Sequence, residues 1–283
     1  MDKEPVYSLL VKEIIRLAVA EDIGHGDITS SLIIPGGERA TARVLAKEDF
    51  ILAGMPFVRE VFASIDPAVE IKGYHGEGAA VRKGEVIAEL SGRARSILAG
   101  ERISLNILQR ISGIATITRA YVEKASGLAV RIADTRKTVP GMRLMEKYGV
   151  RTGGGANHRF GLYDGILIKD NHIKVAGGVG KAIRLAKRAH HLLKIEVEVK
   201  DFDELQEALE AGADIVMLDN MPVEDMAKAV KTARRKNRGV LLEASGNVSL
   251  ENIRMIAETG VDIISIGALT HSARAVDISM KIT

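Results

Sequence analysis

The sequence contains no cysteine and no tryptophan, and its aromatic residues make up only 4% of 283 positions. Without cysteine the chain can form no disulfide bond, no thiolate nucleophile and no cysteine-ligated metal site. Few aromatic side chains also argue against a single-stranded nucleic-acid site, because such sites stack bases on aromatic rings. We therefore expect any chemistry to come from charged, hydroxyl and backbone groups.

A strong net charge and long apolar segments are missing as well. The chain carries 40 Lys and Arg against 37 Asp and Glu, and this net charge of +3 is too small to indicate nucleic-acid binding. No apolar run approaches the roughly 20 residues that span a bilayer, and the charged residues 1–5 lack a signal-peptide pattern. With 46% hydrophobic and 27% charged residues, we expect a cytoplasmic globular protein with neither membrane nor nucleic-acid partners.

One basic run permits two interpretations. It comprises Lys228, Lys231, Arg234, Arg235, Lys236 and Arg238. Nucleic-acid binding is one interpretation. The favoured one is a helix whose last turn carries cations, which the helix dipole stabilises.

The first part of the chain reads as a small α+β region. Helical spacing of apolar residues predicts helices at 6–21 and 101–111. Between them, turn residues separate three strand-like stretches at 42–46, 69–72 and 86–90.

After about residue 115, short β-branched runs alternate with helical patterns. The predicted strands are 129–133, 165–168, 194–199, 214–218, 240–242 and 262–266. The predicted helices are 180–191, 202–211, 223–235 and 250–259. This alternation indicates parallel strands with crossover helices, in either a closed barrel or a doubly wound sheet.

Reactive side chains follow these strands in a definite order. They occur at 134–137, 169–172, 196–198, 219–220, 243–246 and 265–267. In a parallel barrel such positions meet at the C-terminal face, where active sites form. Ser245-Gly246 and Gly267 follow the last two strands, where phosphate commonly binds. Glu198 and Asp219 could hold Mg²⁺ against a substrate phosphate, or serve as a base or as structural carboxylates.

A group of cations is expected at the same face. Three glycines at 153–155 precede His158-Arg159 and allow a tightly bent loop. The predicted group comprises Arg136, Lys137, His158, Arg159 and Lys169. Because burying so much like charge is costly, its natural partner is a small polyanion carrying carboxylates or phosphates. His158 and His172 have no spacing that argues for zinc.

The order of these motifs resembles that of the quinolinate phosphoribosyltransferase family. The resemblance runs from about residue 21 to the C-terminus. Its motifs are Glu101-Arg102-Ile103-Ser104-Leu105-Asn106, 112–116, 134–141, 153–159, Leu167-Ile168-Lys169-Asp170-Asn171-His172, 218–220, 243–246 and 267–272.

This resemblance implies a fold, an assembly and a reaction. The fold is an open seven-stranded TIM-like α/β barrel at 114–283 with an N-terminal α+β sandwich domain at 1–113, with which residues near 270–283 pack. A head-to-tail homodimer would cover each barrel with the partner's N-terminal domain. The reaction converts quinolinate and 5-phosphoribosyl-1-pyrophosphate, with Mg²⁺, to nicotinate mononucleotide, pyrophosphate and CO₂ in NAD biosynthesis.

The resemblance also implies roles for individual residues. Arg136, His158, Arg159 and Lys169 would hold the ring carboxylates, and Arg102 would come from the partner subunit. Glu198 and Asp219 would serve the ribose and Mg²⁺. The 5′-phosphate residues would be Ser245, Gly246, Asn247, Gly267 and His271. Thr135, Ile266 and Ala268 complete the substrate contacts. Lys137, near the pyrophosphate, is assigned to catalysis together with Lys169, Glu198 and Asp219. Asn247 stands where the motif commonly has glycine, and asparagine tolerates the same left-handed backbone.

Two alternatives stay open. A Schiff-base aldolase could use Lys169, provided that the pKa of its amine is depressed. A related branch associated with molybdenum transport shares the fold but differs in the loop at Lys169. Residues 167–172 here fit the quinolinate version.

Overall fold

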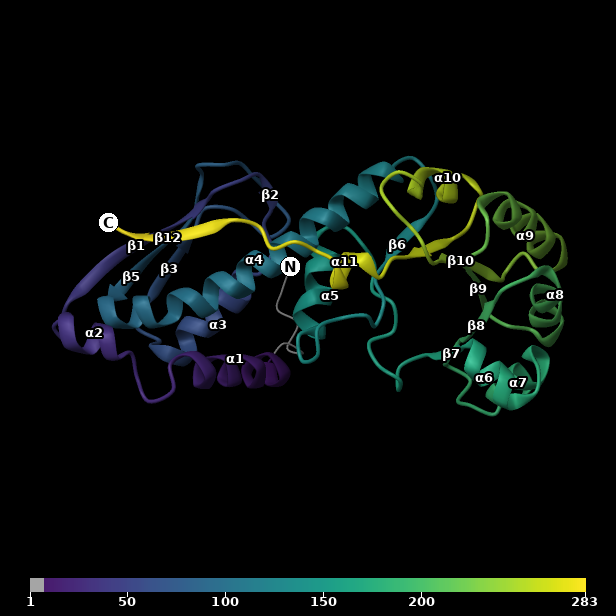
Figure 1. Ribbon diagram of the computed structural model, residues 1–283, viewed down its shortest axis with the longest axis horizontal. Coiled ribbons are helices and arrows are strands. Elements are labelled where there is room, and N and C mark those ends of the chain that lie inside the picture. Colours follow the sequence, from purple (N-terminus) through teal and green to yellow (C-terminus); the bar gives the residue numbers. More distant parts are fainter. Residues whose placement is uncertain (1–7) are drawn as a thin grey trace. The chain divides into compact units, whose positions relative to one another are not determined.

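The computed structural model describes residues 8–283, which form two compact units (Figure 1). The first contains residues 8–119, 138–154 and 269–283, and the second contains 120–137 and 155–268. From the sequence we expect a first domain of 1–113 with which residues near 270–283 pack, whereas the first unit also contains residues 114–119 and 138–154. Residues 6 and 7 of the predicted first helix lie outside the described part.

The first unit is built on an antiparallel sheet of order β12-β1-β5-β3. Its strands are β1 (Arg39–Ala46), β3 (Glu70–Gly73), β5 (Val86–Arg93) and β12 (Ile278–Ile282). A separate pair joins β2 (Phe50–Ile51) to β4 (Ala80–Val81). In β1 the side chains of Ala42, Val44 and Ala46 alternate into the core, and Val44 lies opposite Met280 of β12. The sequence pattern did not predict β12, because its partner β1 lies more than 200 residues away.

Five helices accompany this sheet. They are α1 (Ser8–Asp22), α2 (Ile28–Ile33), α3 (Met55–Ile65), α4 (Ala94–Lys124) and α5 (Arg143–Thr152). Helix α4 has 31 residues and extends well beyond the predicted 101–111, since its buried positions continue from Ile97 to Ile114 and beyond. Despite that length, no helix within residues 8–283 is apolar over a sufficient stretch to cross a membrane.

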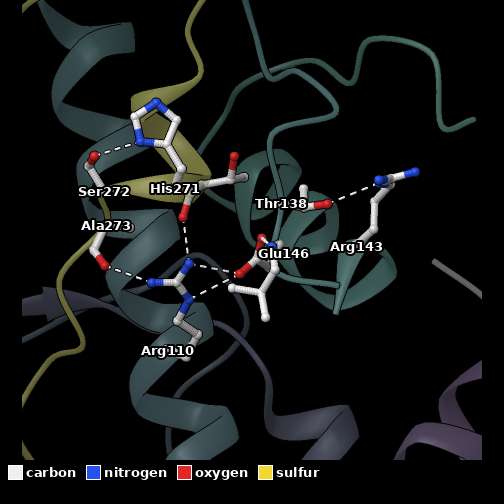
Figure 2. Close-up of polar contacts among 9 residues, drawn as sticks. Arg110, Thr138, Arg143, Glu146, His271, Ser272 and Ala273 are labelled. Carbon is white, nitrogen blue, oxygen red and sulfur yellow. Dashed lines mark hydrogen bonds and ion pairs between the residues drawn. The ribbon is translucent and has the colours of Figure 1, made fainter. Parts of the chain in front are cut away.

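The C-terminal segment packs closely on α4. A Cβ atom added at Gly113 would lie 1.9 Å from the carbonyl oxygen of Arg274, so the two backbones meet where only glycine fits. One turn earlier, Arg110 donates to the carbonyl oxygens of Thr270 and Ala273 and to the buried carboxylate of Glu146 on α5 (Figure 2). This arginine therefore joins three segments that are distant in sequence.

The second unit contains a parallel sheet of order β6-β11-β10-β9-β8-β7. Its strands are β6 (Arg131–Ala133), β7 (Ile166–Ile168), β8 (Ile195–Val199), β9 (Ile215–Asp219), β10 (Leu241–Ser245) and β11 (Ile263–Ser265). All six predicted strands are present in this α/β barrel-like sheet. The family resemblance implies seven strands, whereas the sheet formed by the described residues has six, with an isolated parallel bridge between Ala133 of β6 and Ala156.

Helices connect these strands. They are α6 (Asp170–Ala176), α7 (Val179–Ala186), α8 (Phe202–Ala211), α9 (Val223–Lys236), α10 (Ile253–Glu258) and the short α11 (Ala268–His271), whose last three residues belong to the first unit. Figure 1 shows α8 and α9 on the outer side of β8, β9 and β10. Helix α8 begins where the Asp201 side chain accepts the Glu204 N–H and ends at Gly212 with a φ of 74°.

The basic run identified in the sequence lies at the end of α9. Arg234, Arg235 and Lys236 form its last turn, with Glu224 and Asp225 in its first, which is the arrangement that the helix dipole favours. Arg234 pairs with Asp262, and Lys236 pairs with Glu210. These pairs bind the helix end to neighbouring elements of the second unit.

Candidate active site

A cavity of about 540 Å³ opens at the C-terminal ends of the strands in the second unit. Nine of the predicted site residues line it: Thr135, Arg136, Lys137, His158, Arg159, Lys169, Glu198, Asp219 and Ser245. The remaining wall includes Leu167, Asp170, Met217, Asn220, Glu243 and Ser265. The parallel strands thus bring together side chains that are more than 100 residues apart in sequence.

The cationic side of the cavity comes from the ends of β6 and β7 and from the loop at 155–165. The Arg159 guanidinium donates through Nη1 to the carbonyl oxygen of Gly165, at 3.0 Å. Burial lowers the pKa of Arg159, and the neighbouring charge of Arg136 lowers it further. Two guanidinium groups held this close favour an anion between them.

Lys169 faces the opposite wall. Its Nζ forms an ion pair with Oε1 of Glu198, a half-buried carboxylate on β8. The pair joins a residue predicted to hold a ring carboxylate to one predicted to hold Mg²⁺. Any anion that binds Lys169 must therefore share its ammonium group with Glu198.

A hydrogen bond between two asparagine side chains joins the loops after β9 and β10. Asn220 and Asn247 have positive φ angles of 52° and 50°, and Asn247 Nδ2 donates to Asn220 Oδ1 at 3.0 Å. The left-handed backbone expected at Asn247 is confirmed. Gly246 has a φ of 92°, and a Cβ atom there would lie 2.1 Å from Asn220 Oδ1. This close approach requires glycine, so the two loops fit against one another without room for a side chain.

A polar group at the wall of the cavity was not identified as a unit from the sequence. It consists of His158, Glu196 on β8 and Glu243 on β10, whose ligand-type atoms all lie within 4.8 Å of one another. Glu196 and Glu243 are only 5% and 1% exposed. The signal was present in the sequence: Glu196 and Glu198 are two residues apart on one strand, so both side chains face the barrel interior.

Burial and the neighbouring Glu196 raise the pKa of Glu243 from 4.5 to about 7. The folded protein therefore retains a proton on this carboxyl group that the unfolded chain has already lost. Between these two values the folded state binds more protons at this group, so the contribution of Glu243 to stability falls as the pH rises from about 4.5 to about 7 and stays lower above it.

Replacing Glu243 by glutamine is expected to remove this pH-dependent loss of unfolding free energy, because the amide does not ionise. The wild-type protein should lose about 3 kcal/mol of unfolding free energy relative to the variant between pH 4.5 and pH 8. Urea unfolding at several pH values measures the difference. Glu258→Gln, on an exposed part of α10, is the matched control. Parallel pH curves for wild type and Glu243→Gln would contradict the prediction.

Models of a known family match both parts of the chain. The model described as "Quinolinate phosphoribosyl transferase, C-terminal domain" matches residues 114–281, and the one described as its N-terminal domain matches residues 27–112. The chain belongs to the quinolinate phosphoribosyltransferase family. The family predicted from the sequence motifs is therefore confirmed.

Individual relatives cover nearly the whole chain. It is 45% identical to a probable nicotinate-nucleotide pyrophosphorylase [carboxylating] of Bacillus subtilis over 97% of this chain and 94% of the relative. It is 42% identical to a mitochondrial quinolinate phosphoribosyltransferase [decarboxylating] of Nicotiana glauca over 98% of this chain and 83% of that relative. The solved nicotinate-nucleotide pyrophosphorylase of Francisella tularensis is 44% identical with a TM-score of 0.91, covering 97% and 96% of the two chains.

Several family-motif residues have structural roles. His172 Nδ1 accepts the backbone N–H of Lys169 and thereby caps α6. Gly153 ends α5, where a Cβ atom would lie 2.5 Å from the carbonyl oxygen of Ala115 on α4. The glycine run predicted to approach a ligand therefore serves helix packing at its first residue.

The other predicted site residues do not line the cavity. Gly246, Asn247, Ile266, Gly267 and Ala268 lie in the loops after β10 and β11. Arg102, on the exposed face of α4, and His271, whose Nδ1 lies 2.7 Å from Ser272 Oγ, belong to the first unit. The roles assigned to all seven stay predictions.

Proposed function

We propose that the protein transfers the phosphoribosyl group of 5-phosphoribosyl-1-pyrophosphate to the ring nitrogen of quinolinate, giving nicotinate mononucleotide, pyrophosphate and CO₂. The observation that carries this proposal is the composition of the cavity, with a cationic wall facing a wall of carboxylates. Arg136, Arg159 and Lys169 suit a ring with two carboxylates. Glu198 and Asp219 face the position expected for the sugar.

The chemistry requires positioning and charge more than a nucleophile. Departure of pyrophosphate leaves positive charge on the ribose, and Lys137 at the cavity wall would stabilise the leaving anion. The ring nitrogen attacks the ribose carbon and becomes cationic. The adjacent C–CO₂⁻ bond then breaks with its electron pair retained by the cationic ring, CO₂ leaves, and that ring carbon takes up a proton. Fixed cations can align the ring for both steps.

The residues present fit a magnesium ion held jointly with substrate. Glu198 and Asp219 offer two half-buried carboxylates in one cavity, and Asp219 Oδ1 accepts a hydrogen bond from Asn220 Nδ2 at 3.1 Å. Two protein oxygens with phosphate and water completing the sphere suit Mg²⁺. When bound, the ion would supply positive charge beside the leaving pyrophosphate.

The loops after β10 and β11 are the proposed site of the 5′-phosphate. Replacing Gly246 by alanine should raise the KM for the ribosyl pyrophosphate at least about tenfold, because the new methyl group displaces Asn220 and strains the backbone. Steady-state kinetics measures this. Gly260→Ala is the matched control: its φ is 88°, but a Cβ atom there stays 3.5 Å from its nearest neighbour. Equal effects of the two substitutions would argue against a phosphate role.

A homodimer with Arg102 contributed across the interface remains part of the proposal. In support, α1 and α2 expose Leu9, Leu17, Ile28, Leu32 and Ile33, apolar side chains that suit a protein interface. Mixing subunits of inactive Arg102→Ala and Lys169→Ala under exchange conditions should restore about one quarter of wild-type activity, since half of the dimers would hold one intact site. No recovery after confirmed subunit exchange would contradict a shared site.

The direct test supplies quinolinate, 5-phosphoribosyl-1-pyrophosphate and Mg²⁺ and measures nicotinate mononucleotide by chromatography and CO₂ by trapping. Nicotinic acid is the informative competitor, because it lacks the second carboxylate that the cationic wall would neutralise. Product from quinolinate with little from nicotinic acid is expected. Comparable turnover of nicotinic acid would refute the specificity, and absence of product from either would refute the activity.

A further inference from the structure

The polar group of His158, Glu196 and Glu243 contains buried carboxyl oxygens that lack hydrogen-bond partners among the described residues. Oε1 of Glu196 and Oε1 of Glu243 are both buried and accept no hydrogen bond from the described residues. Two adjacent buried carboxyl groups cost stability, and apolar side chains of similar size would be more stable there. Their presence therefore calls for a functional reason.

The hydrogen bonds of His158 define the state of its imidazole. Nδ1 accepts the backbone N–H of Arg159 at 2.8 Å, so it cannot itself carry a hydrogen. The ring hydrogen of the neutral form then lies on Nε2, which is 3.0 Å from Glu196 Oε2 and 3.8 Å from Glu243 Oε1. Both ring nitrogens are engaged by protein groups. The family-based expectation that His158 grips a ring carboxylate would require one of these contacts to break.

His158 belongs to a loop that has little regular structure but carries a key cation. Arg159 follows it directly, and residues 157–165 form neither helix nor strand. Buried Asp134 accepts the His158 backbone N–H at 2.8 Å and Asn157 Nδ2 at 2.6 Å, which fixes one end of the loop to β6. The imidazole fixes the same loop to Glu196 on β8, on the other side of the barrel interior.

A second cavity lies on the other side of this loop. It measures about 470 Å³ and is lined by residues at the N-terminal strand ends, including Arg131, Lys194, Ile215, Leu241 and Ile263. His158, Arg159 and Glu243 line both cavities, so they form a partition between them. Because a cavity rather than packed side chains lies beneath this part of the loop, the polar contacts of Asn157 and His158 contribute directly to its position.

We propose that Glu196, assisted by Glu243, is a positioning residue that acts through His158: it holds the imidazole as the Nε2–H tautomer and thereby sets the place of Arg159 at the substrate cavity. Glu196 does not line the substrate cavity, so in this proposal it acts on substrate only through His158. The tautomer claim is independent of the reaction, whereas the effect on substrate rests on the function proposed above. A rigid second layer of this kind supports the groups that bind ligand directly.

A double-mutant cycle tests whether Glu196 acts through His158. Glu196→Leu should raise the KM for quinolinate about tenfold or more with little change in kcat and none in the KM for the ribosyl pyrophosphate. Glu196→Gln should restore most of the loss, because its amide oxygen still accepts the Nε2–H. In a His158→Ala background, Glu196→Leu should have less than about a twofold further effect. Multiplicative effects of the two substitutions would overturn the proposal.

Two readouts separate positioning from a general structural defect. The melting temperature of Glu196→Leu should stay close to that of wild type, because the loss of the acceptor for His158 Nε2 is offset by the removal of one of two adjacent buried carboxyl groups. Long-range ¹H–¹⁵N spectra should show His158 as the Nε2–H tautomer in wild type and a mixture in Glu196→Leu. An Nδ1–H or doubly protonated ring in wild type at pH 7.5 would overturn the proposal even if the enzyme is active.

The same spectra distinguish failure of the proposed function. A wild-type protein that is inactive on quinolinate but shows the expected tautomer would refute the proposed function. The proposal that Glu196 holds the His158 imidazole would still be supported. A metal ion is the competing explanation for the three close side chains. If Zn²⁺ or Mn²⁺ raised the melting temperature of wild type but not of Glu243→Gln, the group would be a metal site and the proposal would fail.

Discussion

Replacing Glu146 by alanine is expected to lower the free energy of unfolding by about 3–5 kcal/mol, the usual effect of breaking a buried charge pair on one side. The Glu146 side chain is fully buried, and its Oε1 accepts from Arg110 Nη2 at 2.8 Å and from Nε at 3.1 Å. Its Oε2 accepts the backbone N–H of Val139 at 3.2 Å. The substitution leaves Arg110 Nε and the Val139 N–H without their acceptor and opens a cavity beside α4.

The wider consequence follows from the position of Arg110. The same guanidinium binds the carbonyl oxygens of Thr270 and Ala273, so its release also loosens the segment that leads to β12 (Figure 2). Urea denaturation monitored by circular dichroism measures the change. Glu13→Ala is the matched control, because it breaks the exposed pair with Arg16 on α1 and should leave stability close to that of wild type. A loss at Glu146 no larger than the control's would refute the account.

Replacing Lys169 by methionine is expected to reduce kcat/KM for quinolinate by about 10²- to 10³-fold, equivalent to about 3–4 kcal/mol. Methionine retains much of the side-chain volume but removes the ammonium group. The partner Glu198 is then left with an uncompensated negative charge in a cavity proposed to bind an anionic ring. Both the lost attraction and the new repulsion weaken quinolinate binding.

Steady-state kinetics with each substrate varied measures this effect. Lys200→Met is the matched control, since it breaks the Lys200–Glu204 pair, in which the lysine is 74% exposed and lies outside the cavity. The control should retain activity within about twofold. Equal kinetics of Lys169→Met and wild type would remove Lys169 from the proposed site. Trapping of a substrate on Lys169 by borohydride would instead favour Schiff-base chemistry.

Local patterns predicted the parallel sheet well because its strands are short, buried and separated by amphipathic helices. All six predicted strands are present, and α8 spans the predicted range of 202–211. The same patterns did not predict α2, α3, α5, α6, α11, β2, β4 or β12. The partner of β12 is β1, at the other end of the chain, and hydrophobic periodicity carries no information about such distant pairing.

The candidate site was partly predictable because the parallel strands that carry it could be recognised from the sequence. Side chains that follow parallel strands meet at one face, so the sequence alone assigns Lys169, Glu198 and Asp219 to one site. The role of Glu243 could not be assigned, because it depends on how near Glu196 and His158 approach across the barrel interior.

The sequence alone determined the family, the α/β class and most residues of the cavity, since these depend on ordered motifs and on strand ends. Only the tertiary structure decided that Lys169 is paired with Glu198, that both nitrogens of His158 are occupied and that residues 138–154 belong to the first unit. The physical reason is distance: charge pairing, hydrogen-bond direction and burial fall off within a few ångströms. Residues far apart in sequence acquire these properties only when the fold brings their atoms together.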